Sequence, residues 1–302
     1  MGARAGLRDV GLRRWPHIFR HVLSESAKDR ITMSAASLAF HGFLAFFPAL
    51  VAAIGVLGLG GVSPSSLRRV VGDARVLLPV QMANVIDEAL RRPAHGRADV
   101  LEIVFGLLVA VWSSIEAMAA LQLALDAAYE VDEDRGFVRR RIAAVPLVGV
   151  TVLLGGVASL LLVLGNPIRR LLPASVPFAR PAFDALWLVV RWAGAIVLIM
   201  LLLSALYALA PRLSRRRWEW RSPGSIVAAL GWLVSSGLFS VYLDHFGHES
   251  RSYGAFAGVA VMLLWLFLSS VAILFGAELN RELERVLDEL RATSSRAGPT
   301  LA

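Results

Sequence analysis

The distribution of charge between Trp218 and Glu284 constrains this chain more than any other feature. Two runs in this segment, Ser225–Leu243 and Tyr253–Ala277, contain no charged residue, and a short polar turn joins them. A helix of about 20 apolar residues spans the hydrocarbon core of a bilayer, which is about 30 Å thick. The segment therefore predicts a transmembrane hairpin and places the chain among membrane proteins.

The composition agrees with this class. Hydrophobic residues make up 57% of the chain and charged residues only 18%, which is more apolar than a soluble domain of this size. The absence of cysteine excludes disulfides and Cys-ligated metals, and we expect no metal and no cofactor. The net charge of +8 comes from arginines that flank the apolar runs, so we expect membrane lipids as partners and no specific nucleic acid.

Six apolar runs predict an all-α integral membrane protein, a six-transmembrane-helix bundle, because lipid cannot satisfy backbone polar groups that a helix satisfies internally. This transmembrane domain covers residues 31–277, after an interfacial segment 1–30 and before a cytoplasmic C-terminal helix and tail 278–302. Glu102 and Glu116 lie within the second run and Asp126 lies just beyond it, so this run is the weakest span. The predicted spans are Ile31–Leu59, Val100–Ala124, Ile142–Leu164, Leu186–Ala210, Ser225–Phe246 and Tyr253–Ala277.

The orientation follows from the lysines and arginines, which are enriched on the cytoplasmic side of membrane proteins. The N-terminal segment, the second and fourth loops and the C-terminal tail together carry 20 of the 31 cations. The first, third and fifth loops carry 10, and Arg191 lies within a span. Both termini are therefore predicted to be cytoplasmic in a multi-pass protein of the bacterial inner membrane.

Two segments outside the spans show helical periodicity. In the N-terminal segment, Trp15, Ile18, Phe19, Val22 and Leu23 fall near helical spacing. This pattern predicts an amphipathic helix on the inner leaflet, with a solvated cap on the bundle as the alternative. The first outer loop, 60–99, has two short amphipathic patterns, which predict helices that form a lid or plug over the outer face.

Short motifs along nearly the whole chain, from about Arg13 to Arg285, give it a resemblance to a known family. In this order and spacing the chain resembles the YihY/BrkB family of bacterial inner-membrane proteins. The motifs are Asp29-Arg30-Ile31, Ala35 to Phe40, Phe47-Pro48, Trp112-Ser113-Ser114, Ala127-Ala128-Tyr129, Arg139-Arg140-Arg141, Leu206-Tyr207, Ala210-Pro211, Pro223-Gly224, Phe246-Gly247, Tyr253-Gly254, Leu264-Trp265-Leu266 and Gly276-Ala277-Glu278-Leu279-Asn280.

The resemblance implies a six-helix protein of the cytoplasmic membrane whose molecular activity is not settled. Some members of the family carry a virulence label, and others carry an older name as a tRNA-processing ribonuclease, ribonuclease BN. The resemblance therefore implies location and fold, and no catalytic or binding residue.

Polar residues recur at similar depths in the cytoplasmic half of the predicted spans. Ionisable groups inside a span are costly and point to function, so Glu116 and His41 are the main candidates. They could be the ionisable elements of a polar cavity that opens toward the cytoplasm. The hydroxyl candidates at comparable depth are Ser113, Ser204, Ser235 and Ser269.

Each candidate also has a structural interpretation. Glu116 could be a neutral acid, a partner of His41, or a link to a neighbouring helix through hydroxyl groups. The serines favour the structural interpretation, since such hydroxyls commonly bond the carbonyl one turn back. Pro48 is a candidate hinge inside the first span. Glu278 and Asn280 lie at the inner mouth of the sixth span, where ligand contact and hydrogen bonding at a helix end are both open.

These features favour a transporter-like protein that handles lipids or small solutes and is not an enzyme. A membrane scaffold that organises the envelope is the main alternative, and the ribonuclease is a remote one. Homo-oligomerisation is open, because glycines such as Gly254 and Gly258 would permit close helix contacts within or between chains. The substrate is unknown from the sequence.

Overall fold

The computed structural model describes residues 14–28, 31–59, 97–131, 135–171, 180–212, 222–246 and 254–296. Within these residues all regular structure is helical. The helices are α1 (Trp15–Lys28), α2 (Ile31–Leu59), α5 (Arg97–Ala128), α6 (Phe137–Leu171), α7 (Arg180–Leu209), α8 (Pro223–Phe246) and α9 (Gly254–Arg296). The fold class predicted from the uncharged runs is therefore confirmed as all-helical.

Five of these helices, α2, α5, α6, α7 and α9, contain a stretch long and apolar enough to cross a membrane. The apolar stretch recognised in α8 is shorter, Pro223–Phe239, so the count of six spans and the orientation of the termini remain predictions. The two helices predicted for the first outer loop fall almost entirely on residues 60–96, outside the described residues.

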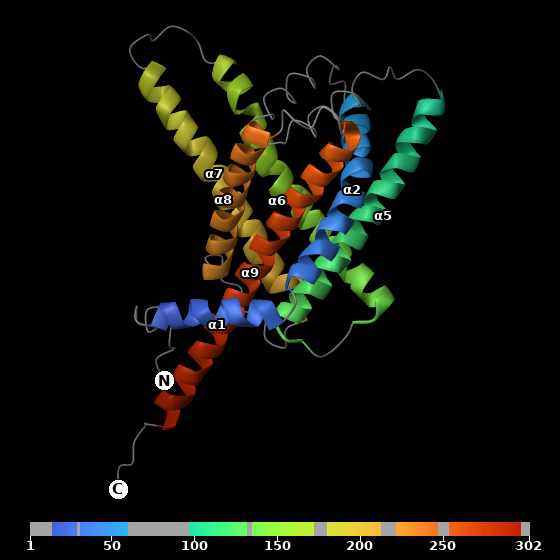
Figure 1. Ribbon diagram of the computed structural model, residues 1–302. Coiled ribbons are helices and arrows are strands. Elements are labelled where there is room, and N and C mark those ends of the chain that lie inside the picture. The colour runs from blue at the N-terminus through green and yellow to red at the C-terminus, as the bar shows by residue number, and fades with distance from the viewer. Residues whose placement is uncertain are drawn as a thin grey trace.

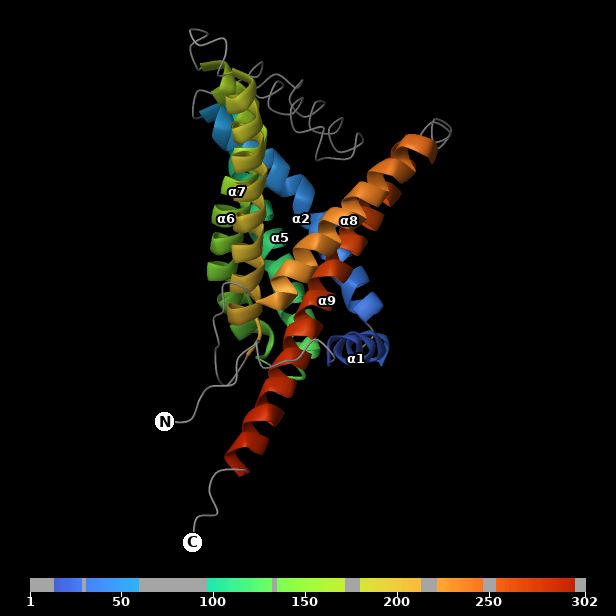
Figure 2. The same ribbon diagram turned by 90° about the vertical axis from the view of Figure 1, so that its left-hand side faces the viewer.

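The long helices run roughly side by side, and α1 lies across one end of them (Figures 1 and 2). The last turns of α9 extend beyond the bundle at this same end, which we call the inner end because it is predicted to be cytoplasmic. Helix α2 packs against α5 and α9, α6 packs against α7, and α8 packs against α9. Figure 2 shows the α8–α9 pair tilted away from α6 and α7 toward the opposite end.

The main hydrophobic core lies in the inner half of the bundle. Its members come from the first turns of α2, α6 and α8, from the last turns of α5 and α7 and from the middle of α9, for example Ala35, Leu125, Ala144, Leu206 and Ala228. Apolar residues elsewhere on the long helices are largely exposed. Exposed apolar faces are expected where lipid replaces water as the solvent.

Helix α1 divides its apolar residues between the bundle and the surroundings. Ile18 and Val22 are buried in a second core cluster, while Leu23 is 60% exposed and Phe19 36%. One face of α1 therefore packs on the bundle, as the cap alternative predicted, and the position of its other face on the inner leaflet stays a prediction. The α9 members of this cluster are Leu279, Leu283 and Leu287.

Helices α8 and α9 cross at two glycines. A Cβ added to Gly224 would collide with the carbonyl oxygen of Gly276. A Cβ on Gly276 would lie 2.6 Å from the hydroxyl of Tyr207 and 2.8 Å from the Cβ of Ala228. Glycine is needed at both positions because the backbones approach too closely for any side chain.

We predict that Gly276→Ala lowers the thermal stability of the purified protein in nanodiscs, by about 1–3 kcal/mol, because the methyl group overpacks the crossing. Gly237→Ala is the matched control, since it lies on α8 with no atom within 4 Å of the added Cβ. Equal melting temperatures for the two variants would contradict the crossing.

Candidate functional site

The inner end contains a buried helix start that a side chain from another helix completes. Helix α8 begins with Pro223, which has no N–H to satisfy. The N–H of Gly224 donates to Asn280 Oδ1 over 2.8 Å, and the N–H of Ser225 donates to Ser222 Oγ over 3.2 Å. Asn280 also donates to Ser222 Oγ over 3.2 Å. Asn280 of α9 and Ser222 therefore cap α8 together.

Asn280 and Glu278 were predicted at the inner mouth of the last span, and the structure buries both of them. Asn280 also forms a hydrogen bond with Tyr129, which follows α5. Burial raises the pKa of the Tyr129 phenol well above its usual range, and the charges of Glu284 and Glu278 add to the rise. The phenol is therefore neutral and serves as a hydrogen-bonding group. Asn280 completes the start of α8, and α9 itself continues to Arg296.

The chain leaves α5 through a tight turn. Glu130 has a positive φ of 52°, and the N–H of Val131 donates to the carbonyl of Asp126 over 2.8 Å. This pattern is the Schellman motif, in which a left-handed residue ends the helix. The chain then passes through Gly136, which has a positive φ of 68°, and enters α6. Arg135 therefore lies between the end of α5 and the start of α6.

Two polar residues of α5, one helical turn apart, form hydrogen bonds with groups near the loop that follows α5. Gln122 and Asp126 are both buried. Arg135 Nη1 donates to Gln122 Oε1 over 3.2 Å and to the carbonyl of Ala210 over 2.7 Å. Asp126 Oδ1 accepts from the backbone N–H of Arg212 over 2.9 Å. The end of α7 is therefore tied to α5, and Arg135 satisfies one of the carbonyls that a helix end leaves without a partner.

A groove lies beside these two arginines, between α6 and the end of α7. Its volume is about 500 Å³, within the range of small-molecule sites. The wall residues on α6 follow the i, i+3, i+4, i+7 spacing of one helix face. The groove is lined by Ala143, Pro146, Leu147, Val150 and Leu209, with Arg135 and Arg212 at the end nearest the start of α6. It combines an apolar wall with a cationic end.

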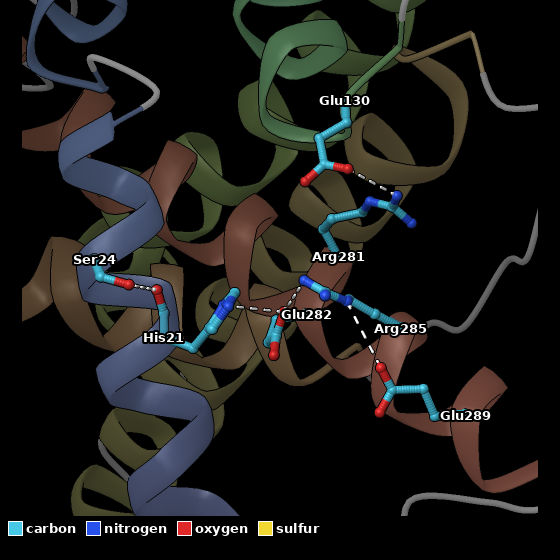
Figure 3. A network of polar contacts seen from close by, with 7 residues as sticks. All are labelled: His21, Ser24, Glu130, Arg281, Glu282, Arg285 and Glu289. Atoms are coloured by element: carbon cyan, nitrogen blue, oxygen red, sulfur yellow. Dashed lines mark hydrogen bonds and ion pairs between the residues drawn. The ribbon is translucent and has the colours of Figure 1, made fainter.

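Ion pairs on the inner surface link α9 to α1 and to the turn after α5 (Figure 3). Arg281 pairs with Glu130 over 3.1 Å, and His21 lies 3.3 Å from Glu282. Arg285 approaches Glu282 and Glu289, its neighbours along α9, at 3.9 and 3.8 Å. Half of these side chains, those of Glu130, Arg285 and Glu289, are more than 50% exposed, so the pairs that they form contribute little to stability.

The structure gives Glu116 a partner that was not predicted. Arg141 donates from Nε and Nη2 to the two carboxylate oxygens of Glu116, both over 2.6 Å. The Arg141 guanidinium also lies over the Phe137 ring. His41 Nδ1 instead lies 2.8 Å from the carbonyl of Ser37. Glu116 is therefore paired with Arg141 of α6 and not with His41, because the guanidinium forms two hydrogen bonds with its carboxylate.

The serines predicted at comparable depth take part in separate contacts within and between helices. Ser204 donates to Ser225 Oγ between α7 and α8, over 3.1 Å, and Ser269 donates to the carbonyl of Trp265 within α9, over 2.8 Å. Ser113 lies one turn before Glu116, and Ser235 lies on α8, both half-buried. The structure therefore does not gather these residues with Glu116 and His41 around one described pocket.

Helix α2 continues through Pro48 to Leu59. The hinge that was predicted at this proline remains a prediction.

The chain is similar to known bacterial proteins along most of its length. Residues 22–300 match the family described as virulence factor BrkB. The chain belongs to this BrkB family. The match covers the described helices almost completely, and the family resemblance found in the sequence is confirmed.

Relatives in other bacteria support the same membrane class. The ribonuclease-like protein YfkH of Bacillus subtilis (strain 168) is 32% identical over 251 residues, which is 83% of this chain and 89% of that protein. The UPF0761 membrane protein Nmul_A0452 of Nitrosospira multiformis is 27% identical over 268 residues, 87% of this chain and 60% of that protein. No solved structure matches the chain. This BrkB-family chain is thus a multi-pass bacterial membrane protein.

The groove and the residues that build it were not predicted from the sequence. Arg135 and Arg212 were counted only as charges that set the orientation, and Asp126 only as a weakness of the second span. One signal was present: Gln122 and Asp126 lie one turn apart on the last turns of an apolar helix. Polar residues at such a position require partners, and the arginines of the next loops were the available donors.

We predict that Glu116→Gln and Arg141→Gln each destabilise this BrkB-family protein by about 1–2 kcal/mol, between the values for exposed and buried pairs. In thermal unfolding in nanodiscs, the double variant should lose less than the sum of the two single variants. Arg139→Gln, an exposed arginine in the first turn of α6, is the control. Additive losses would show that the pair is not coupled.

Proposed function

We propose that this protein is a transporter-like membrane protein that handles lipids, and that the α6–α7 groove is its lipid site. The observation that carries the proposal is the form of the groove, which has five apolar residues along its wall and two arginines at one end. This distribution matches an amphiphile, whose chain requires an apolar wall and whose headgroup requires polar contacts. Aqueous solutes lack the apolar part.

The position of the groove supports the same function. The arginines lie next to the start of α6 and the end of α7, at the predicted cytoplasmic surface. The apolar wall from Ala143 to Val150 extends two helical turns, about 10 Å, into the predicted membrane. A lipid of the inner leaflet would therefore have its headgroup and its chain at the depths where the groove offers matching side chains.

A non-transporting scaffold is the second candidate function. It is favoured by the cap at Asn280 and the crossing at Gly224, which join several helices firmly at the inner end. A scaffold would need this packing and would not need the groove.

Nuclease chemistry has less support. It usually depends on clustered metal ligands or a histidine pair, whereas the described lining of the groove is arginine and apolar residues. The ribonuclease-like name is that of YfkH.

We predict that Ala143→Phe removes bound lipid from the purified protein, because the ring fills the groove. Native mass spectrometry after extensive detergent washing should detect retained lipid on the wild type and less on the variant. Val145→Phe is the control, since Val145 is on the same helix but is 54% exposed and does not line the groove.

Equal lipid retention by the wild type and both variants would exclude the groove as the lipid site. If none of the three retained lipid while all unfolded at the same temperature, the scaffold would become the better proposal.

A further inference from the structure

We infer that the cationic end of the groove binds the phosphate of an anionic phospholipid of the inner leaflet, through Arg135 and Arg212. This inference rests on the proposed function, since it names the class of lipid for the same groove. It makes Arg135 the main headgroup ligand.

The hydrogen bonds of Arg135 orient its guanidinium. Both described bonds leave from Nη1, to Gln122 Oε1 and to the carbonyl of Ala210. Neither uses the Nε–Nη2 edge, which is the edge that binds two oxygens of a phosphate side by side. A phosphate could therefore bind to Arg135 without displacing the bonds that hold the side chain.

Burial makes this orientation rigid. Gln122 is fully buried, so its amide lies at a fixed place in the core, and Ala210 is fixed at the end of α7. A side chain that is already ordered loses little conformational freedom when a ligand arrives. Arg212 differs, because its backbone is held by Asp126 while the residue itself is exposed. Arg212 therefore lies at the exposed side of the cationic end.

The charge around the groove favours an anion. The described lining residues include two arginines and no carboxylate. The start of α6 lies next to Arg135 in the chain, and the positive end of its helix dipole adds to the attraction. Asp126 is buried and already accepts the backbone N–H of Arg212. A phosphate would therefore meet complementary charge, whereas a zwitterionic headgroup would add a cation that has no described carboxylate in the lining.

The apolar wall decides between a lipid and a soluble phosphate. Leu147 and Val150 on α6 and Leu209 on α7 extend the groove away from the arginines. A soluble phosphate ester would leave this wall without a matching group. The first part of an acyl chain would pack against this wall, and the contribution there is van der Waals contact, since the chain is already out of water in the membrane.

The test compares four probes on the full-length protein in detergent, by native mass spectrometry and thermal shift. They are phosphatidylglycerol, phosphatidylcholine and diacylglycerol with the same chains, and inorganic phosphate. We expect phosphatidylglycerol to bind more tightly than the two other lipids and to raise the melting temperature most. Arg135→Gln should weaken its binding about tenfold, equivalent to about 1.4 kcal/mol.

Three variants keep the result interpretable. Arg135→Lys retains the charge but lacks the bidentate edge, so it should recover only part of the affinity. Arg212→Gln should also weaken binding, and this variant keeps the backbone N–H that Asp126 accepts. Arg139→Gln should bind like the wild type, since this exposed arginine does not line the groove.

The outcomes separate the two proposals. If all three lipids bind equally, Ala143→Phe abolishes their binding and the arginine variants bind normally, the phosphate site is wrong and the lipid groove stands. If Ala143→Phe has no effect on any lipid, both proposals fail. If inorganic phosphate competes with phosphatidylglycerol at equal affinity, the occupant is a soluble phosphate, which overturns the lipid inference.

Discussion

The cap on the first turn of α8 is the interaction on which the inner end depends. A helix start in the core leaves backbone N–H groups that water cannot reach, and each one without a partner would cost a buried hydrogen bond. Pro223 removes one of these donors, Ser222 accepts another, and Asn280 accepts the N–H of Gly224. Asn280 can reach it only because the backbones touch at Gly224 and Gly276. The position of α8 is thus determined by two glycines and one amide.

The position of the groove depends on the same need for hydrogen-bond partners at helix ends. The end of α7 leaves carbonyls without partners, and Arg135 satisfies the one at Ala210. Asp126 takes the next backbone N–H, at Arg212. The side chains that complete the helix ends are therefore also the ones that bring two arginines to the groove. Nη1 of Arg135 stabilises the fold, and we propose that its Nε–Nη2 edge binds the lipid phosphate.

The long helices could be predicted from the sequence because lipid imposes a simple rule on them. The first span was predicted at Ile31–Leu59, which is where α2 lies, and Tyr253–Ala277 lies almost entirely within α9. Side-chain partners could not be predicted in the same way, since they depend on how each helix is rotated against its neighbours. Glu116 shows this: its depth suggested His41, but the rotation of α5 against α6 brought Arg141 to it. The contacts of Arg135 could not be predicted for a further reason, because they depend on the turns at Glu130 and Gly136 on either side of it.

The central claim is that a lipid phosphate occupies the end of the α6–α7 groove at Arg135. A cryo-electron microscopy structure of the protein in nanodiscs containing phosphatidylglycerol tests it most directly. We expect density for an acyl chain along Ala143 and Val150, with the phosphate on the Nε–Nη2 edge of Arg135 and Nη1 still bonded to Ala210. A groove closed by side chains, or ordered lipid only on the outward faces of the helices, would contradict the claim.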